Sequence, residues 1–207
     1  MTEPWTLYEK HAGLWVELRR PGVELEAAWL DKFCASLPAG SPLLDLGCGH
    51  GDPIGRELLE RGYQVWGIDR AAPLIEVAQS NLPHGCWSVG DMSSFDVDGV
   101  FSGIVMWHSL FHLPPPEQRA VFHRVAAHTE AGSMLMFTSG TEAGTASGEF
   151  AGESLAHYSL DVAEYEELLT TYGFEVVEFR ESDPGCGHAN IWLTQRALSD
   201  ESQSQET

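Results

Sequence analysis

Three glycines stand at every second position in the stretch LLDLGCGHGDPIG, at Gly47, Gly49 and Gly51. An apolar run precedes them and a helical pattern follows, so the backbone turns sharply there and can approach a ligand closely. A dinucleotide-binding loop would carry its third glycine at position 52, where this chain has Asp52. Asp52 and Pro53 suit the N-cap and first position of a helix, and a carboxylate there disfavours a pyrophosphate. The turn therefore favours a ligand without phosphate groups.

Aspartates follow the same edge of the expected sheet. Asp45 lies in the first strand, Asp69 ends the second and Asp91 follows the third. Ligands of open parallel sheets bind at the carboxyl ends of the strands. Carboxylates gathered there suit a ligand with a positive charge, an amino group and a ribose diol.

Four histidines are candidate general bases, because imidazole titrates near neutral pH. His108 and His112 follow an apolar run in WHSLFHL, His157 ends a Gly/Ser-rich stretch, and His188 lies in the loop SDPGCGH. Structural roles also fit three of them: His112 at a helix end, His157 on the surface and His188 in a glycine turn. The spacing of His108 and His112 suits a metal ion, but no HExxH glutamate lies between them and the four cysteines form no CxxC pair. We predict no metal site.

The elements that position these residues alternate along the chain. Apolar strands are expected at 43–46, 64–68, 86–89, 101–107 and 133–138, and helices at 53–60, 73–81 and 117–128. This order predicts a parallel sheet with helices on both faces. Residues 139–159 are rich in Gly, Ser and Thr and predict a long loop, a candidate lid. A helix from Asp161 to Tyr172 and strands at 174–180 and 189–195 close the fold, the last strand antiparallel.

Helical spacing is also expected over 3–19 and 23–37, before the sheet begins. We therefore divide the chain into a helical cap at 1–40, a main domain at 41–196 with a lid-like insertion at 139–159, and a disordered acidic tail at 197–207.

Composition limits the partners. The 207 residues carry a formal net charge of −20, which repels nucleic-acid backbones. No apolar run is long enough to span a membrane and no secretory signal is visible at the N-terminus, so we expect a cytoplasmic protein with reduced cysteines.

Five motifs together resemble the class I S-adenosylmethionine (SAM) dependent methyltransferases over residues 8–196. LLDLGCGHG resembles the family's first motif, VWGID the acidic end of its second strand, VGDMSSF its adenine-contact motif, FSGIVMWHSLFHL its fourth strand and AGSMLMFTSG its fifth. The resemblance implies SAM as cofactor. It also implies a three-layer Rossmann-like α/β fold whose seven-stranded, mostly parallel sheet has an antiparallel last strand.

The resemblance also implies roles for individual residues in binding the cofactor. The backbone of Gly47, Cys48 and Gly49 would follow the methionyl part and ribose, Asp45 would hold the ammonium group and Asp69 the ribose hydroxyls. The remaining cofactor residues implied are Arg70, Asp91 and Met92 at the adenine, Trp107 near the sulfonium, and Tyr8 and Trp15 as a cover.

Each of these positions also has a structural interpretation. Asp45 can cap backbone amides, Asp69 can simply end its strand and Asp91 can form an Asx turn. Trp107 fits a core, and Tyr8 and Trp15 fit the packing of a helix.

The function implied is transfer of the SAM methyl group to an oxygen, nitrogen or sulfur of a small molecule, because the chain has no room for an accessory domain. Aromatic side chains are available to line an acceptor pocket, at Trp15, Trp107, Phe111, Phe150 and Tyr158. We expect a monomer or homodimer. The alternatives are a non-catalytic SAM-binding protein or partner subunit, an NAD-dependent oxidoreductase, an enzyme that uses SAM without methylating, and a nucleic-acid methyltransferase, which the negative charge opposes.

Overall fold

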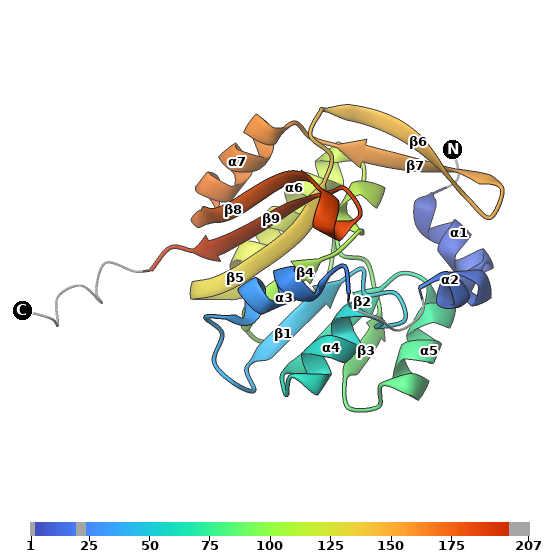
Figure 1. Ribbon diagram of the computed structural model, residues 1–207, viewed down its shortest axis with the longest axis horizontal. Helices are drawn as coiled ribbons and strands as arrows, with labels where there is room; N and C mark the ends of the chain where they lie inside the picture. Colours follow the sequence, from blue (N-terminus) through green and yellow to red (C-terminus); the bar gives the residue numbers. More distant parts are fainter. Residues whose placement is uncertain (1–2, 20–23, 199–207) are drawn as a thin grey trace, which may run out of the picture.

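A seven-stranded sheet forms the centre of the computed structural model, which describes residues 3–19 and 24–198 (Figure 1). The strand order is β3-β2-β1-β4-β5-β9-β8. The strands are β1 (Pro42–Leu46), β2 (Gln64–Asp69), β3 (Cys86–Val89), β4 (Phe101–Met106), β5 (Thr129–Ser139), β8 (Phe174–Asp183) and β9 (Ala189–Arg196). Only β9 runs against its neighbours β5 and β8, whereas the other pairs are parallel. The expected fold class is therefore confirmed.

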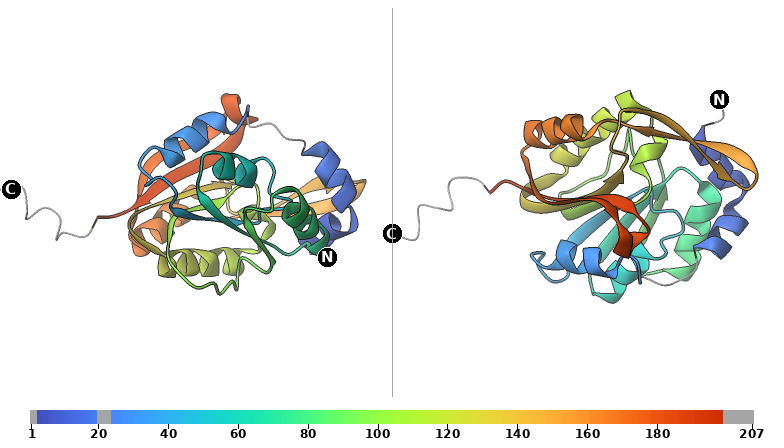
Figure 2. Two further views of the ribbon diagram at one scale, coloured as in Figure 1. Left: turned by 90° about the horizontal axis from the view of Figure 1, so that it is seen from below. Right: turned by 45° about the horizontal axis from the view of Figure 1, so that its top comes forward.

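Helices cover both faces of this sheet (Figure 2). On one face α3 (Ala27–Cys34), α4 (Ile54–Glu60) and α5 (Ala72–Asn81) bury side chains against the sheet in one apolar cluster. On the other face α6 (Pro115–Ala127) and α7 (Val162–Thr171) do the same in a second cluster. The sheet is thus the middle of three layers.

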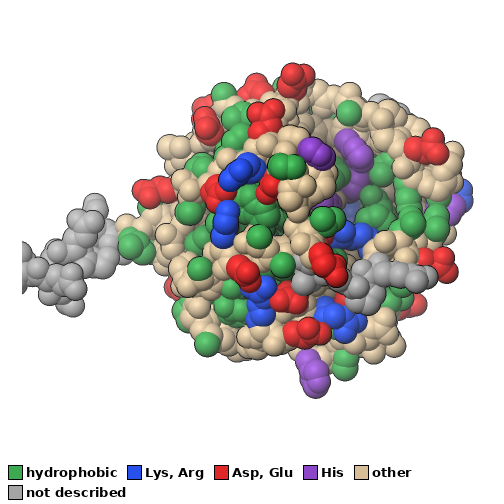
Figure 3. Space-filling model, in the orientation of Figure 1, with side chains coloured by type: hydrophobic (Ala, Val, Ile, Leu, Met, Phe, Trp, Pro, Cys, Tyr) green, Lys and Arg blue, Asp and Glu red, His purple; other side chains and the backbone are tan. Residues whose placement is uncertain are grey.

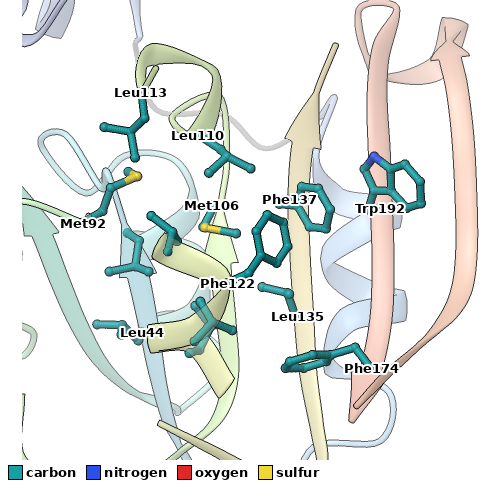
Figure 4. Packing of buried hydrophobic residues seen from close by; sticks show 14 of the residues in the cluster. Leu44, Met92, Met106, Leu110, Leu113, Phe122, Leu135, Phe137, Phe174 and Trp192 are labelled. Atoms are coloured by element: carbon teal, nitrogen blue, oxygen red, sulfur yellow. The ribbon is translucent and has the colours of Figure 1, made fainter. Parts of the chain in front are cut away.

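Aromatic packing holds the β5–β9 half of the sheet (Figure 4). The rings of Phe137 on β5 and Trp192 on β9 are stacked with centroids 5.6 Å apart, and both are fully buried. Tyr165 of α7 is buried beside them and donates a hydrogen bond from Oη to Oε1 of Gln118 at 2.7 Å. Burying a large apolar side chain contributes roughly 1.5–3 kcal/mol. Asp161 caps α7 as expected, its Oδ1 accepting from the Glu164 amide at 2.8 Å.

The expected N-cap at Asp52, with Pro53 as the first helical residue, is wrong. Pro53 occupies the cap position of α4, and its first helical residue is Ile54. The Asp52 carboxylate instead pairs with Arg56, where Nη2 and Oδ2 are 3.0 Å apart. An arginine one turn into the helix competes for the carboxylate with the backbone amides.

The long loop expected at 139–159 is a β-hairpin, which corrects the sequence reading. Strands β6 (Gly144–Phe150) and β7 (Glu153–Ser159) pair antiparallel along their whole length. Ala151 and Gly152 both have positive φ, as a two-residue hairpin turn requires. Most of the hairpin is exposed and only Phe150, Leu155 and Ser159 are buried, so the alternating apolar pattern that reveals a strand is missing.

Two short helices rather than one occupy the N-terminal segment, namely α1 (Pro4–Lys10) and α2 (Ala12–Leu18), which meet at His11. Figure 1 shows both beside the end of the β6–β7 hairpin. Position 23 of the second expected helix lies outside the described residues, as do positions 199–207 of the expected tail. Among the described helices, none is long and apolar enough to cross a bilayer.

Candidate functional site

A cavity of about 320 Å³ opens at the carboxyl edge of the sheet. Its walls come from the glycine turn after β1, the ends of β2 and β4, the N-terminal helices and β7. All the predicted cofactor residues except Asp91 line it: Tyr8, Trp15, Asp45, Gly47, Cys48, Gly49, Asp69, Arg70, Met92 and Trp107. The fold therefore brings residues from five segments of the chain to one space.

Hydrogen bonds to β2 hold the glycine turn in place. The amides of Gly47 and Cys48 both donate to the Ile68 carbonyl, at 2.8 and 3.1 Å. Gly47 has φ +78°, and a Cβ added to it would lie 2.3 Å from Cβ of Ser109. Ser109 is fixed there because its Oγ donates to the Leu46 carbonyl at 2.7 Å. Both the backbone conformation and the close approach therefore require glycine at position 47.

The Asp69 carboxylate is held by the glycine turn on one side and by the start of α5 on the other. Its Oδ2 accepts from the Gly49 amide and its Oδ1 from the Ala71 amide, each at 2.9 Å. Burial raises the pKa of Asp69, and these backbone hydrogen bonds partly offset the rise. Each carboxylate oxygen keeps a further lone pair, so the side chain can still accept from two hydroxyl groups of a ligand.

Asp45 is a buried carboxylate in the same wall, only 3% exposed. It accepts no hydrogen bond from any residue that the structure describes. Burial, and secondarily the charge of Asp69, raise its pKa to about 7. A buried carboxylate without a partner favours a cationic ligand group, which fits the ammonium of SAM.

Asp91 lies outside the cavity lining. Its Oδ1 accepts from both the amide and the Oγ of Ser93 at 2.8 Å. These contacts form the Asx turn that the sequence offered as the structural interpretation of Asp91. Its Oδ2 lies 3.6 Å from Nη1 of Arg70, which does line the cavity. Arg70 also pairs with Glu3 at 3.3 Å and stacks over the Trp5 ring at 4.8 Å.

His108 and His112 both line the cavity. His108 follows β4 with φ 52°, a left-handed conformation that is uncommon away from glycine and is enriched at functional sites. Its amide donates to Oγ1 of Thr138 at 2.9 Å, which holds this conformation. Burial, and secondarily the charge of Arg19, lower the pKa of His108 to about 4, so its imidazole is neutral near pH 7.

His112 ends the short helix η1 (Leu110–His112) and contacts Tyr8. Its Nε2 lies 3.0 Å from Oη of Tyr8. Burial first, and then the neighbouring His157, lower the pKa of His112 to about 3. Burial also raises the pKa of Tyr8, so the phenol is protonated and donates to the neutral ring.

The other two candidate histidines do not line the cavity. The ring of His157 on β7 packs behind His112, with centroids 5.2 Å apart. His188 is exposed in the loop between β8 and β9, where its Nδ1 lies 3.0 Å from Oγ of Ser182. The structure thus places His108 and His112 in the cavity lining. His157 contacts His112 from outside the lining, and His188 lies away from the cavity.

The expected aromatic pocket is partly assembled. Trp15, Trp107 and Tyr158 line the cavity, whereas Phe111 and Phe150 do not. Phe150 instead stacks on Tyr8 with ring centroids 5.1 Å apart and so joins the hairpin to the N-terminal helices. Phe111 packs on the ring of His157 at 5.0 Å.

The cavity also has a lining residue that sequence reasoning missed, Arg19. Its Nη2 pairs with Oε1 of Glu26 at 3.1 Å, and Glu26 is only 3% exposed. The two consecutive arginines at 19 and 20 match no motif, so only the fold shows that Arg19 reaches the cavity.

No cluster of three or more metal-ligating side chains occurs within residues 3–19 and 24–198. Acidic side chains are spread over the face shown in Figure 3, with fewer basic ones between them.

Residues 43–132 match the family model of a methyltransferase domain. An uncharacterized methyltransferase of Anoxybacillus flavithermus is 25% identical over 152 residues, which cover 67% of this chain and 71% of that protein.

Two solved structures illustrate the likeness of the fold. A SAM-bound amino pentose methyltransferase of Micromonospora echinaspora, involved in calicheamicin biosynthesis, has a TM-score of 0.71 and 18% identity, covering 90% of this chain and 96% of that one. A glycopeptide N-methyltransferase in complex with SAM has a TM-score of 0.66 and 17% identity, covering 86% and 95%. These structures confirm the predicted fold. The two sequence matches support the predicted methyltransferase class.

Proposed function

We propose that this chain is a class I SAM-dependent methyltransferase that transfers the methyl group of SAM to an oxygen, nitrogen or sulfur atom of a small molecule. The proposal rests on the lining of one cavity, which has two chemically different parts. The glycine turn and two buried aspartates form one part, and aromatic and histidine side chains form the other. Cofactor and acceptor would thus meet in one space, where side chains of both parts can align them.

The geometry of the first part supports the following cofactor-binding roles. Asp69 would accept from the ribose hydroxyls, and Asp45 would face the ammonium group. The backbone of Gly47, Cys48 and Gly49 would follow the chain between them. Arg70 and Met92 would flank the adenine, with Asp91 at its edge, and Tyr8, Trp15 and Trp107 would close the site. The cofactor supplies a methyl group on a sulfonium, so the protein needs to align the acceptor rather than activate the donor.

His108 is the proposed general base for an acceptor that must lose a proton. It lines the cavity, and burial keeps its imidazole neutral near pH 7, so a ring nitrogen with a free lone pair faces the site where the acceptor would lose its proton. His112 would act together with Tyr8, whose Oη lies 3.0 Å from Nε2 of His112. His157 would hold the His112 ring in position by packing against it. His188 has no place in this proposal, because it is exposed away from the cavity.

The small-molecule class is supported by size and charge. A cavity of about 320 Å³ suits a small ligand, and a net charge of −20 opposes a nucleic acid. Two similar folds belong to proteins named for an amino pentose and a glycopeptide. Amino sugars therefore belong in an acceptor panel beside catechols and aliphatic thiols.

The first experiment is calorimetric titration of the purified protein with SAM, S-adenosylhomocysteine and NAD. Micromolar binding of the two adenosyl ligands is expected, with a large loss in Asp69→Ala and little change in the surface variant Asp161→Asn. Preference for NAD, or no binding of SAM, would contradict the proposal.

The second experiment follows release of S-adenosylhomocysteine with the acceptor panel. His108→Ala should bind S-adenosylhomocysteine normally and lose turnover of hydroxyl acceptors by about 100-fold or more, whereas His188→Ala should keep it. A protein that binds SAM tightly and transfers to no acceptor would instead be a non-catalytic SAM-binding protein.

A further inference from the structure

We propose that the methyl acceptor is an aromatic hydroxyl compound, a phenol, which binds uncharged against a wall of rings. The inference rests on the proposed function and narrows the acceptor atom from oxygen, nitrogen or sulfur to a phenolic oxygen. Five lining side chains form this acceptor wall: Tyr8, Trp15, His108, His112 and Tyr158. The shape of the wall, the charges around it and the chemistry of His108 each support the proposal.

The acceptor wall is built of rings that hold one another in place. The Tyr8 ring lies edge-on to Trp15 and to His112, with centroids 4.9 and 5.2 Å apart. Behind this row, Phe150 stacks on Tyr8 at 5.1 Å and Phe111 lies edge-on to His112 at 4.8 Å. Rings have few rotatable bonds, so the wall offers flat faces at fixed positions. Such faces suit another ring better than a flexible chain.

The Tyr8 hydroxyl offers the acceptor molecule lone pairs and no proton. Its O–H donates to Nε2 of the neutral His112 ring at 3.0 Å. The remaining lone pairs of Oη can accept from an O–H group of a ligand, whereas a ligand carboxylate would meet them with lone pairs of its own. A thiol is the poorer match, because S–H is only a weak donor.

The charges of the cavity lie away from the acceptor wall. The described lining residues include five carboxylates: Glu3, Asp45, Asp52, Asp69 and Glu117. Two of them lie beside the glycine turn and one pairs with Arg56. The other two lie within reach of the charge of Arg70, at the proposed adenine end. In the described lining, no carboxylate is thus left over as a counter-charge for an ammonium group on the acceptor.

The histidines of the acceptor wall show the same lack of negative charge. Burial is the main cause that lowers the pKa of His108 and His112, and the charges that add to it are those of Arg19 and of neighbouring histidines. No carboxylate of the described chain opposes this lowering. A ligand ammonium would meet the same penalty. An aliphatic amine with a pKa near 10.4, as in lysine, is neutral in only about one molecule in a thousand near pH 7.4.

The basicity of His108 separates phenols from other hydroxyl compounds. Its pKa is about 4, whereas a phenol has a pKa of about 10, like tyrosine, and an aliphatic alcohol about 16, like water. Proton transfer to His108 is therefore uphill by about six pKa units from a phenol and about twelve from an alcohol. So weak a base can assist the phenol far better than the alcohol.

The step balances without a further reactant. The phenolic O–H bond breaks and its proton goes to a ring nitrogen of His108, while a lone pair of the oxygen forms the new bond to the methyl carbon. The S–CH3 bond breaks and leaves its electron pair on sulfur. An aryl methyl ether and S-adenosylhomocysteine are formed, and the imidazolium of His108 returns its proton to water.

The test uses a panel of substituted phenols, each matched with a benzyl alcohol and a benzylamine of the same size, such as 4-ethylphenol, 4-methylbenzyl alcohol and 4-methylbenzylamine. Calorimetry at about pH 7.4 on protein saturated with S-adenosylhomocysteine should show that phenols and alcohols bind with similar affinity and the amines at least about tenfold more weakly. With SAM, mass spectrometry should detect methylation of phenols alone.

A matched pair of variants tests the role of charge. Tyr158→Glu adds a carboxylate to the acceptor wall, and Tyr158→Gln has the same shape without the charge. The affinity for the benzylamine relative to the phenol should be about tenfold higher in Tyr158→Glu than in Tyr158→Gln. Equal ratios in the two variants would show that charge does not select the acceptor.

The outcomes separate this inference from the proposed function. Methylation of a benzylamine, a benzyl alcohol or an aliphatic thiol at a rate comparable with the phenols, or no binding of any phenol, would overturn the phenol assignment and leave methyl transfer standing. Failure to bind SAM, or binding of SAM without transfer to any acceptor, would overturn both.

Discussion

Two carboxylates in one wall of the cavity have different surroundings, and this difference has consequences at the residue scale. Asp69 accepts from two amides, whereas Asp45 accepts from none in the described chain and is the more deeply buried of the two. The pKa of Asp45 is consequently raised to about 7, so this side chain titrates in the physiological range.

Cofactor affinity should therefore depend on pH. A ligand ammonium binds the ionised form of Asp45, so affinity should be constant above pH 7 and fall by up to about tenfold per pH unit below it. Calorimetry with SAM between about pH 5.5 and pH 8 measures this. In Asp45→Asn the affinity should be lower and nearly independent of pH. A flat profile in the wild-type protein would show that Asp45 does not meet the ammonium.

The glycine turn gives a second prediction at this scale. Gly47→Ala adds a methyl group that meets Ser109 and Met92, and it also forces alanine into φ +78°. We expect about 2–4 kcal/mol of lost unfolding free energy, measured by urea denaturation. Gly62→Ala is the control, because Gly62 has φ +88° but nothing within 4 Å of its added Cβ, so about 1 kcal/mol is expected. Equal losses in the two variants would mean that the close approach at Gly47 costs nothing.

The sequence pointed to Asp45, Asp69 and the glycine turn because these residues occupy fixed places relative to strands, and parallel strands bring their carboxyl ends together. Arg19 carries no such signal. It lies far from the glycine turn in the sequence, and only the packing of α2 against that turn brings it to the cavity.

At the scale of elements, the β6–β7 hairpin and the N-terminal helices pack against each other beside the cavity. Phe150 and Leu155 of the hairpin form a small apolar cluster with Leu7 of α1. Oε1 of Glu153 lies 2.7 Å from both Nζ of Lys10 and Nε2 of His11. Tyr8 and Trp15, which line the cavity, also pack on Phe150.

Phe150→Ala should therefore loosen the N-terminal helices with little effect on the sheet. We expect faster amide hydrogen exchange in residues 4–18, unchanged exchange in β4 and β5, and about tenfold weaker binding of S-adenosylhomocysteine. Phe150→Leu, which keeps most of the apolar volume, is the control. Unchanged exchange in residues 4–18 would show that the helices are held by other contacts.

The regular elements were predictable because their hydrophobic patterns are strong, as at the apolar strand Phe101–Met106. The hairpin was missed because its strands are mostly exposed and made of small polar residues, which are equally typical of loops. The helix start at Asp52 was misjudged because a capping residue and an ion-pair partner have the same sequence signature.

At the scale of the whole molecule, the charge of −20 acts on any charged ligand that approaches. SAM carries one net positive charge near pH 7, and S-adenosylhomocysteine is neutral overall. The protein field should therefore speed association of SAM only.

Stopped-flow tryptophan fluorescence can measure this difference. Raising NaCl from about 20 mM to about 300 mM should slow association of SAM by about threefold and leave S-adenosylhomocysteine nearly unchanged. Equal slowing of both ligands would exclude electrostatic steering as the cause.

The hairpin follows β5 and leads into α7 at neighbouring points, since Gly144 at its start faces Ser159 at its end. Removing or replacing it would leave the register of β5 with β4 and β9 intact. Under the proposed function, exchanging this hairpin for another would change the wall that Tyr158 contributes to the cavity, and with it the choice of acceptor, while the glycine turn and its aspartates stay the same.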